Sequence, residues 1–254
     1  MINKLIFCFV LAFISSCGDS KSKETVLPEV TEDNSKQTVE KMAERHIESK
    51  LSIPATEKYT YKIYKEHLDD DGKIDAIITV NRMEFAMDEA SRSNNTAKLA
   101  EIGFMGNYNF LFLFDGGLNM ISPQIAIPSS PMAELVVSFE NIQSDKFKDV
   151  LVDFRIKNAS YKDYYVISNH IPRRVFQWKN YDGLTSKISE AYYFEYGDGT
   201  MTEMKDILVK KAILKQPTKE VDVSKYAPEL TKTDELVFRF FYHPKEGKYM
   251  TLRK

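Results

Sequence analysis

Short hydrophobic runs separated by turn-forming residues dominate the chain from about residue 59 onward. The runs are rich in Ile, Val, Phe and Tyr, and several alternate apolar with polar positions, as strands with one buried face do. Pairs of runs joined by glycine-containing turns predict β-hairpins. The expected strands cover residues 59–65, 76–80, 110–114, 118–121, 135–139, 150–154, 164–168, 174–178, 191–196, 200–205, 236–242 and 249–252.

Two segments have a pattern that predicts helix instead. Between residues 36 and 50, Val39, Met42 and Ile47 recur at helical spacing. Residues 83–102 are rich in Ala, Glu and Met, and a serine followed by two asparagines interrupts them. The whole pattern predicts a mainly β fold, a β-rich α+β class with antiparallel sheets, hairpins and one N-terminal helix.

The first 16 residues have the layout of a secretory signal peptide. Lys4 supplies a positive charge, residues 5–14 form an apolar run, and small residues follow. The apolar run is about half the roughly 20 residues that a membrane-spanning helix needs. We therefore expect residues 1–16 to be removed on maturation.

The residues Ile14-Ser15-Ser16-Cys17 resemble the lipobox of bacterial lipoproteins. In that family the cysteine is acylated and becomes the mature N-terminus, so the resemblance implies lipidation of Cys17. Several acyl chains on one residue hold a protein on a membrane, whereas a single chain binds only marginally. The resemblance implies a place in the bacterial cell envelope, with the membrane as partner through the lipid anchor and the domain outside the cytoplasm.

The segment behind the cysteine predicts a spacer. Residues 17–36 are polar and charged without an apolar period, which is typical of a flexible tether. Residues 37–254 are then expected to form a single β-rich domain.

Composition narrows the function classes. The chain has 35 Lys and Arg against 37 Asp and Glu, a balance that argues against a nucleic-acid partner. Its two cysteines are Cys8, in the signal peptide, and Cys17. The mature domain is therefore expected to have no disulfide and no cysteine nucleophile.

A weak internal repeat relates residues 66–75 to residues 140–149. Both segments carry acidic residues at the first, sixth and last positions, and both precede an apolar strand. The similarity predicts duplicated units at about 59–130 and 131–185, with chance similarity as the alternative. A closed propeller would need at least four blades, so we expect an incomplete or sandwich-like arrangement.

The first of these segments has the composition of a calcium loop. Asp69, Asp71 and Asp75 offer oxygen ligands, and Gly72 allows the sharp bend that wraps a loop around Ca²⁺. The alternative is a solvated acidic turn whose aspartates cap backbone N–H groups.

Residues 67–75, and more weakly 141–149, resemble the Asp-rich loops of FG-GAP/VCBS-type β-repeats, which lead into an apolar strand. The resemblance implies a bound calcium ion that makes the loop rigid. His67 departs from the pattern at the first ligand position, and imidazole is a poor calcium ligand. Lys146 replaces the glycine in the second segment, which argues against a metal there.

Trp178 and Tyr181 are the candidate ligand-binding residues. They belong to an aromatic cluster that could stack on a carbohydrate, and packing of the same rings across strands is the alternative. The other members of the cluster are Tyr161, Tyr164, Tyr165 and Phe176.

No catalytic motif is present in the sequence. The four histidines lack zinc-binding spacing, and neither a Gly-x-Ser-x-Gly elbow nor a phosphate-binding glycine loop occurs. The sequence therefore predicts a membrane-anchored envelope lipoprotein with a non-catalytic binding or structural domain, stabilised by calcium and partnered by an envelope protein or a glycan. The alternative is an envelope hydrolase acting on glycans or peptides, with catalytic carboxylates among its many acids.

Overall fold

The computed structural model describes residues 32–93 and 96–251 of the chain, so the expected signal peptide, Cys17 and most of the expected tether lie outside the described residues. The helices are α1 (Glu32–Lys50), α2 (Met83–Ser93) and α3 (Thr96–Gly103). The strands are β1 (Thr60–Glu66), β2 (Asp75–Asn81), β3 (Asn109–Asp115), β4 (Met120–Ile121), β5 (Ile125–Ala126), β6 (Val136–Glu140), β7 (Asp149–Ile156), β8 (Ala159–Ser168), β9 (Ile171–Asp182), β10 (Glu190–Gly197), β11 (Asp206–Leu214), β12 (Leu230–His243) and β13 (Lys248–Met250).

The strands form two antiparallel sheets, which confirms the prediction of a mainly β fold. One sheet has five strands in the order β1-β2-β3-β4, with β5 beside β3, and the other has eight strands running from β6 to β13. Helices α2 and α3 connect β2 to β3, in the second segment where the composition predicts helix.

The larger sheet consists of two four-stranded meanders joined by a short contact. β9 and β10 pair only where Asp182 meets Glu190 and Tyr181 meets Ala191. We call β1–β4 the first meander, β6–β9 the second meander and β10–β13 the third meander. Each is a run of consecutive antiparallel strands.

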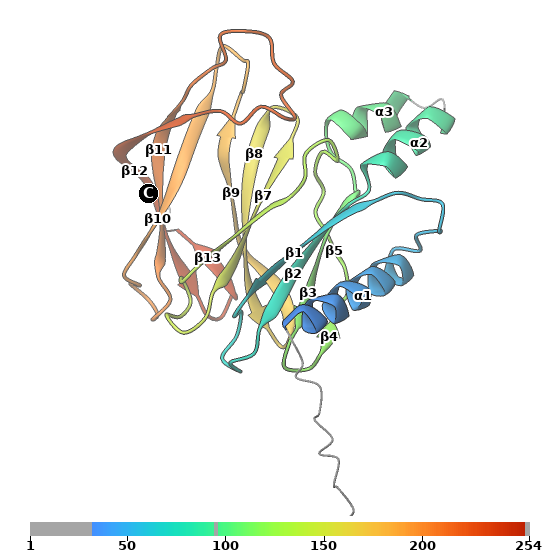
Figure 1. Ribbon diagram of the computed structural model, residues 1–254. Helices are drawn as coiled ribbons and strands as arrows, with labels where there is room; N and C mark the ends of the chain where they lie inside the picture. Colours follow the sequence, from blue (N-terminus) through green and yellow to red (C-terminus); the bar gives the residue numbers. More distant parts are fainter. Residues whose placement is uncertain (1–31, 94–95, 252–254) are drawn as a thin grey trace, which may run out of the picture.

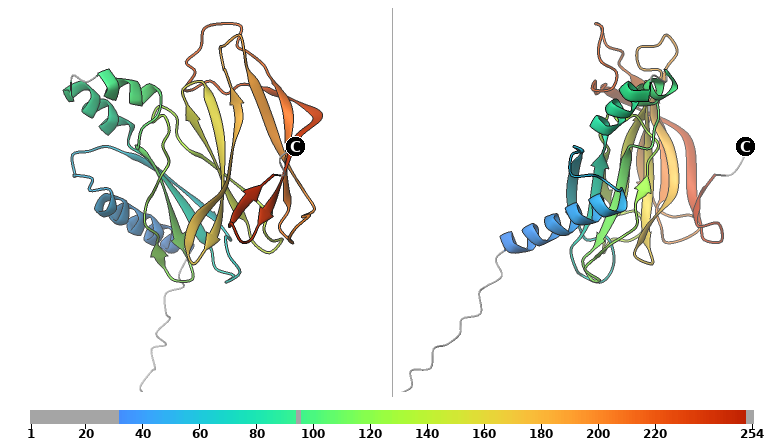
Figure 2. Two further views of the ribbon diagram at one scale, coloured as in Figure 1. Left: turned by 180° about the vertical axis from the view of Figure 1, so that it is seen from behind. Right: turned by 90° about the vertical axis from the view of Figure 1, so that its right-hand side faces the viewer.

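The three meanders stack as successive layers, with α1 on the outer face of the first (Figures 1 and 2). Ala43 and Ile47 of α1 pack against the first meander. On β7, Val150 and Val152 pack toward the first meander, whereas Leu151 packs toward the third. The period of two along a strand therefore lets the second meander bury both of its faces.

Each meander begins with a hairpin of the same register. The residue that ends the first strand pairs with an aspartate at the same separation along the chain: Glu66 with Asp75, Glu140 with Asp149, and Gly197 with Asp206. We call residues 67–74, 141–148 and 198–205 the first, second and third loops. The sequence comparison found two copies of this unit, and the structure contains a third.

One predicted strand, at residues 200–205, is wrong. Residues 200–205 were expected to be the second strand of a tight hairpin, but they belong to the loop, and β11 begins at Asp206. The glycines at 197 and 199 favour a tight turn. In the structure the Asp206 carboxylate instead accepts hydrogen bonds from the backbone N–H and the hydroxyl of Thr200, at 3.2 and 2.9 Å, and holds the longer loop.

The helix boundary also differs from the expected tether. Residues 32–36 were assigned to the tether, yet α1 begins at Glu32. Extending an existing helix costs far less than nucleating one. Once the packed part of α1 has formed, the helix can therefore extend into the preceding polar segment, although that segment has no apolar period.

Candidate metal centre

Asp75, one of the three predicted calcium ligands, closes the first loop. It begins β2 and is 2% exposed. One carboxylate oxygen accepts the Leu68 N–H at 3.0 Å and the other accepts the Gly116 N–H at 2.9 Å, from the turn after β3. Both oxygens are thus used to join backbone segments.

The other two predicted ligands shape the loop itself. Asp69 accepts the backbone N–H of Asp71 at 3.0 Å, and Asp71 accepts that of Lys73 at 2.7 Å. The Asp71 carboxylate lies so close to Gly117 that a β-carbon there would be 1.9 Å from its Oδ2. A side chain at residue 117 would therefore require the Asp71 carboxylate to move.

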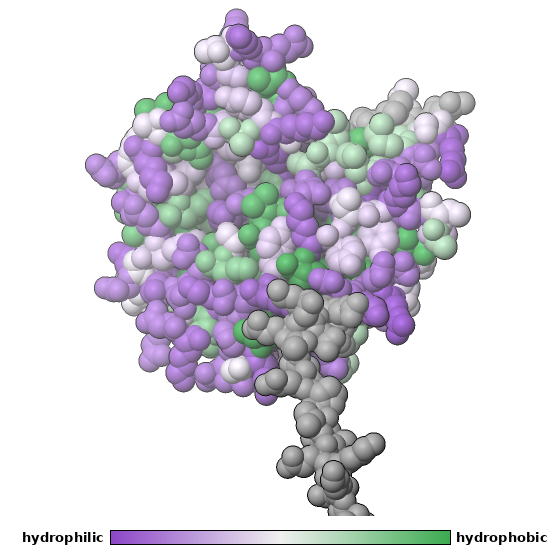
Figure 3. All heavy atoms as spheres, viewed as in Figure 1, coloured by the Kyte–Doolittle hydropathy of each residue, from purple (hydrophilic) through white to green (hydrophobic). Residues whose placement is uncertain are grey.

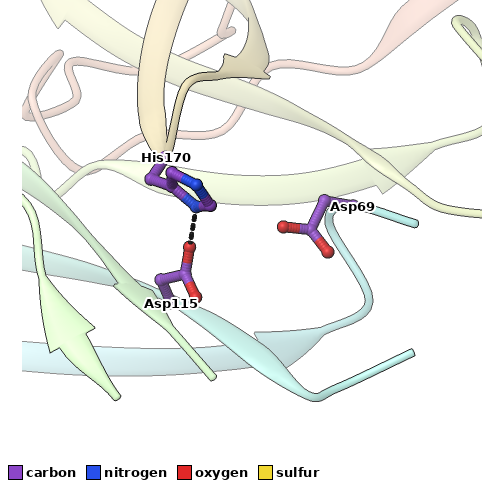
Figure 4. Close-up of side chains that lie close together, drawn as sticks. All are labelled: Asp69, Asp115 and His170. Carbon is purple, nitrogen blue, oxygen red and sulfur yellow. Dashed lines mark hydrogen bonds and ion pairs between the residues drawn. The ribbon is translucent and has the colours of Figure 1, made fainter. Parts of the chain in front are cut away.

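The structure brings Asp69 together with two residues that the sequence analysis did not select. Asp69 in the first loop, Asp115 at the end of β3 and His170 in the β8–β9 turn place one ligand atom each within 4.8 Å of one another (Figure 4). His170 Nδ1 lies 2.5 Å from Asp115 Oδ2. Asp71 and Asp75 are not members of this group, which joins the first meander to the second.

Local backbone geometry presents His170 to the group. Asn169 and His170 both have left-handed φ values, 52° and 61°, between the paired ends of β8 and β9. Positive φ at both central residues is the requirement of a type I′ hairpin turn, which favours Asn followed by Gly. Histidine at the second position is therefore strained, while its ring reaches Asp115.

Negative charge is concentrated where these segments meet. Burial raises the pKa of Asp69, and the carboxylates of Asp71 and Asp115 raise it further. Burial likewise raises the pKa of Asp75, with added repulsion from Asp69 and Asp115. A bound cation would relieve this repulsion and favour the ionised carboxylates.

The donor set suits a transition metal better than calcium. Zinc takes imidazole nitrogen and carboxylate oxygen, usually with four ligands, whereas calcium takes six to eight oxygens. Asp69, Asp115 and His170 supply one nitrogen and two carboxylates, and water would complete the shell.

The second loop repeats the closing aspartate but has a lysine among its oxygen atoms. Asp149 accepts the N–H groups of Ile142 and Gln143, at 3.0 and 2.6 Å, and burial raises its pKa to about 6. Lys205 Nζ, from the third loop, donates to the Asn141 carbonyl at 2.8 Å and lies 3.3 Å from an Asp145 carboxylate oxygen.

Trp178 and Tyr181, the predicted ligand-binding residues, have different surroundings. Trp178 packs between the second and third meanders, 5.3 Å from the rings of Phe238 and Phe240, and its indole N–H is buried. Tyr181 is 5% exposed and lines a groove of about 460 Å³ between β10 and the second meander.

A larger hollow, of about 890 Å³, lies between the segment after α1 and helices α2 and α3. Its deepest charges are already paired, since both Glu57 oxygens accept from the Arg82 guanidinium at 2.6 Å. Arg82 also lies 4.1 Å from the Phe85 ring centroid. These contacts explain Glu57 and Arg82 as structural residues, so we do not select the hollow as the candidate site.

Comparison with known proteins gives no relative from which a role could be carried over. No family model, no curated protein and no solved structure matches the chain. Among the described residues, no helix has the length and apolar character needed to cross a membrane. On the face shown in Figure 3, hydrophilic residues dominate and hydrophobic residues form small separate groups.

Proposed function

We propose that this chain is a lipid-anchored protein of the bacterial envelope with a non-catalytic β-rich domain, stabilised by a divalent cation at Asp69, Asp115 and His170. The observation that carries the cation assignment is the meeting of ligand atoms from three separate segments within 4.8 Å. The cation would connect the first and second meanders. The signal-peptide pattern of residues 1–16 and the resemblance of residues 14–17 to a lipobox support the anchor.

The anchor has a direct test in bacterial cells. Replacing Cys17 by serine removes the acylated thiol, so the variant should leave the membrane fraction, while the wild-type chain stays there. Unchanged fractionation of Cys17→Ser would refute the anchor without bearing on the cation.

The cation is tested by thermal unfolding of the full, untagged chain in detergent. After treatment with chelator, Zn²⁺, Mn²⁺ or Ca²⁺ is added to separate samples. A cation at about 100 times its Kd stabilises the native state by about 2.7 kcal/mol. For a chain of this size that raises Tm by about 5–10 °C. We expect the largest shift with Zn²⁺.

Matched variants assign any shift to the site. Asp115→Asn keeps an acceptor for the Leu118 N–H, and His170→Gly suits the left-handed turn, so both should fold but lose the shift. Asp70→Asn removes one carboxylate charge, as Asp115→Asn does, but from the residue next to Asp69 and outside the group, and it should keep the shift. A shift that survives both site variants would contradict the assignment.

A further inference from the structure

The groove lined by Tyr181 has the construction of a ligand site. It runs across one face of the second meander and along β10, and residues 227–230 close one side. Its volume of about 460 Å³ falls within the range of small-molecule sites, about 300–1,000 Å³. No residue of the metal group lines it, so the two sites are separate.

The floor of the groove is a fixed polar network on three adjacent strands. Asp153 of β7 accepts from Lys162 of β8 at 2.9 Å and from Asn180 of β9 at 2.8 Å. Asn180 also lies 3.1 Å from the Ser160 hydroxyl. Lys162 uses one of three ammonium protons on Asp153, which leaves donors for a ligand.

The facing wall is aromatic. Tyr192, Phe194 and Tyr196 alternate along β10, so their rings lie on one side of the strand. Each ring is half-buried and packs against the aromatic core between the second and third meanders. The core behind them holds the rings in place and leaves their other sides at the groove.

An aromatic wall opposite a hydrogen-bonding floor matches the chemistry of a sugar ring. A sugar presents an apolar C–H face, which packs on aromatic rings, and hydroxyl groups, which pair with carboxylate, amide and ammonium groups. An acyl chain would leave the Asp153–Lys162 pair desolvated without new partners, which is costly. For phosphate groups the groove has more negative than positive side chains: the carboxylates of Glu134, Glu140 and Asp153 outnumber the cations of Arg155 and Lys162.

We propose that this groove binds a neutral oligosaccharide. The inference gives the non-catalytic domain of the proposed function a binding role and names the ligand class. It rests on that domain being non-catalytic, but it needs neither the cation nor the anchor.

The single tryptophan of the chain provides the measurement. Trp178 lies 6.3 Å from the Tyr192 ring, which forms part of the wall, so its fluorescence reports on ligand in the groove. The full chain in detergent is titrated with cellotetraose, chitotetraose and maltotetraose. At least one should give a saturable change, and calorimetry should give the same Kd.

Variants of the wall and floor then locate the binding. Tyr192→Leu removes a ring but keeps apolar bulk, and Lys162→Met removes only the ammonium. Each should weaken the affinity about tenfold, and circular dichroism checks that both fold. Lys187→Met and Tyr61→Leu, at residues that do not line the groove, should leave Kd unchanged.

The proposal is overturned if none of the three tetrasaccharides binds saturably, or if Lys162→Met and Tyr192→Leu both bind like the wild type. Saturable binding of tetra-alanine that depends on these two residues, with no saccharide binding, would assign the groove to peptides instead. Chelator and Cys17→Ser should leave Kd unchanged, so failure of the cation or the anchor is read separately from failure of the groove.

Discussion

The first and second loops have the same backbone pairing but different surroundings for their oxygen atoms. In both, a buried aspartate accepts the N–H of the residue seven positions before it at 3.0 Å: Asp75 from Leu68, and Asp149 from Ile142. The ammonium of Lys205 lies among the oxygens of the second loop. The first loop instead faces Asp115 and His170, through Asp69.

This difference separates the residues that build the repeat from those that give each copy its chemistry. The closing aspartate occurs in all three hairpins, and in the third Asp206 also accepts Arg239 Nε at 2.7 Å. The second and third loops thus have cationic side chains beside their oxygens. At the first loop, Lys146 lies 3.5 Å from the exposed Asp70 carboxylate, and at Asp69 an external cation would take the corresponding place.

Backbone hydrogen bonds connect the loops in series. The Lys148 N–H donates to the His67 carbonyl at 2.8 Å, and the Lys205 N–H donates to the Ile142 carbonyl at 2.9 Å. A change that opens one loop is therefore expected to disturb its neighbour.

The largest predicted effect comes from removing a closing aspartate. Asp149→Ala leaves the buried Ile142 N–H and the partly buried Gln143 N–H without their acceptor, and each such loss costs about 1–3 kcal/mol. We expect the free energy of unfolding, measured by urea titration, to fall by about 3 kcal/mol. Asp75→Ala should lower the free energy of unfolding by a similar amount, because it removes the acceptor of the Leu68 and Gly116 N–H groups.

The control for both variants is Asp70→Ala. Asp70 is an exposed member of the first loop that lies 3.5 Å from the equally exposed Lys146 ammonium. Its replacement should change stability by less than about 0.5 kcal/mol. Equal losses in all three variants would show that the closing hydrogen bonds do not set the stability of the loops.

The sequence was sufficient for the elements whose signals are local. Apolar runs located both strands of the first two unit hairpins, and the matching acids, among them those at 75 and 149, indicated a weak repeat. The third copy was not predicted, because the glycines at 197 and 199 indicated a tight turn rather than a longer loop. The shared spacing before Asp206 was the available signal.

The metal group could not be predicted in the same way. Asp115 follows an apolar strand and precedes two glycines, and His170 lies in a short turn far along the chain. Their meeting with Asp69 depends on how the second meander packs on the first, which no short-range spacing encodes. In the same way, the packing of the third meander on the second places Trp178 in the aromatic core between them.

An effect of similar size, specific to the second loop, is expected on changing pH. Burial raises the pKa of Asp149 to about 6, above the value of about 3.9 expected in the unfolded chain. The native state therefore binds a proton that the unfolded state releases between these values. The resulting stabilisation is full below about pH 4 and is lost as the pH rises through 6, by about 3 kcal/mol in all.

Asp149→Asn isolates this contribution, because the amide oxygen still accepts a hydrogen bond and does not titrate. Urea unfolding at a series of pH values should show the advantage of the wild type over Asp149→Asn shrinking between pH 4 and 7. A difference that stays constant over this range would contradict the raised pKa.

The smallest predicted effect concerns the Lys205 ammonium, which lies beside the oxygen atoms of the second loop. Lys205→Met keeps the backbone bond to Ile142 and the aliphatic stem but removes the ammonium from Asn141 and Asp145. The side chain is more than one third exposed, so we expect a loss of only about 1 kcal/mol in urea unfolding. Lys146→Met removes an equal charge from a long, exposed contact with Asp70 and should cost less than about 0.5 kcal/mol. If the two variants lose the same stability, Lys205 is an ordinary surface lysine, and the contrast between the first and second loops reduces to their acidic side chains.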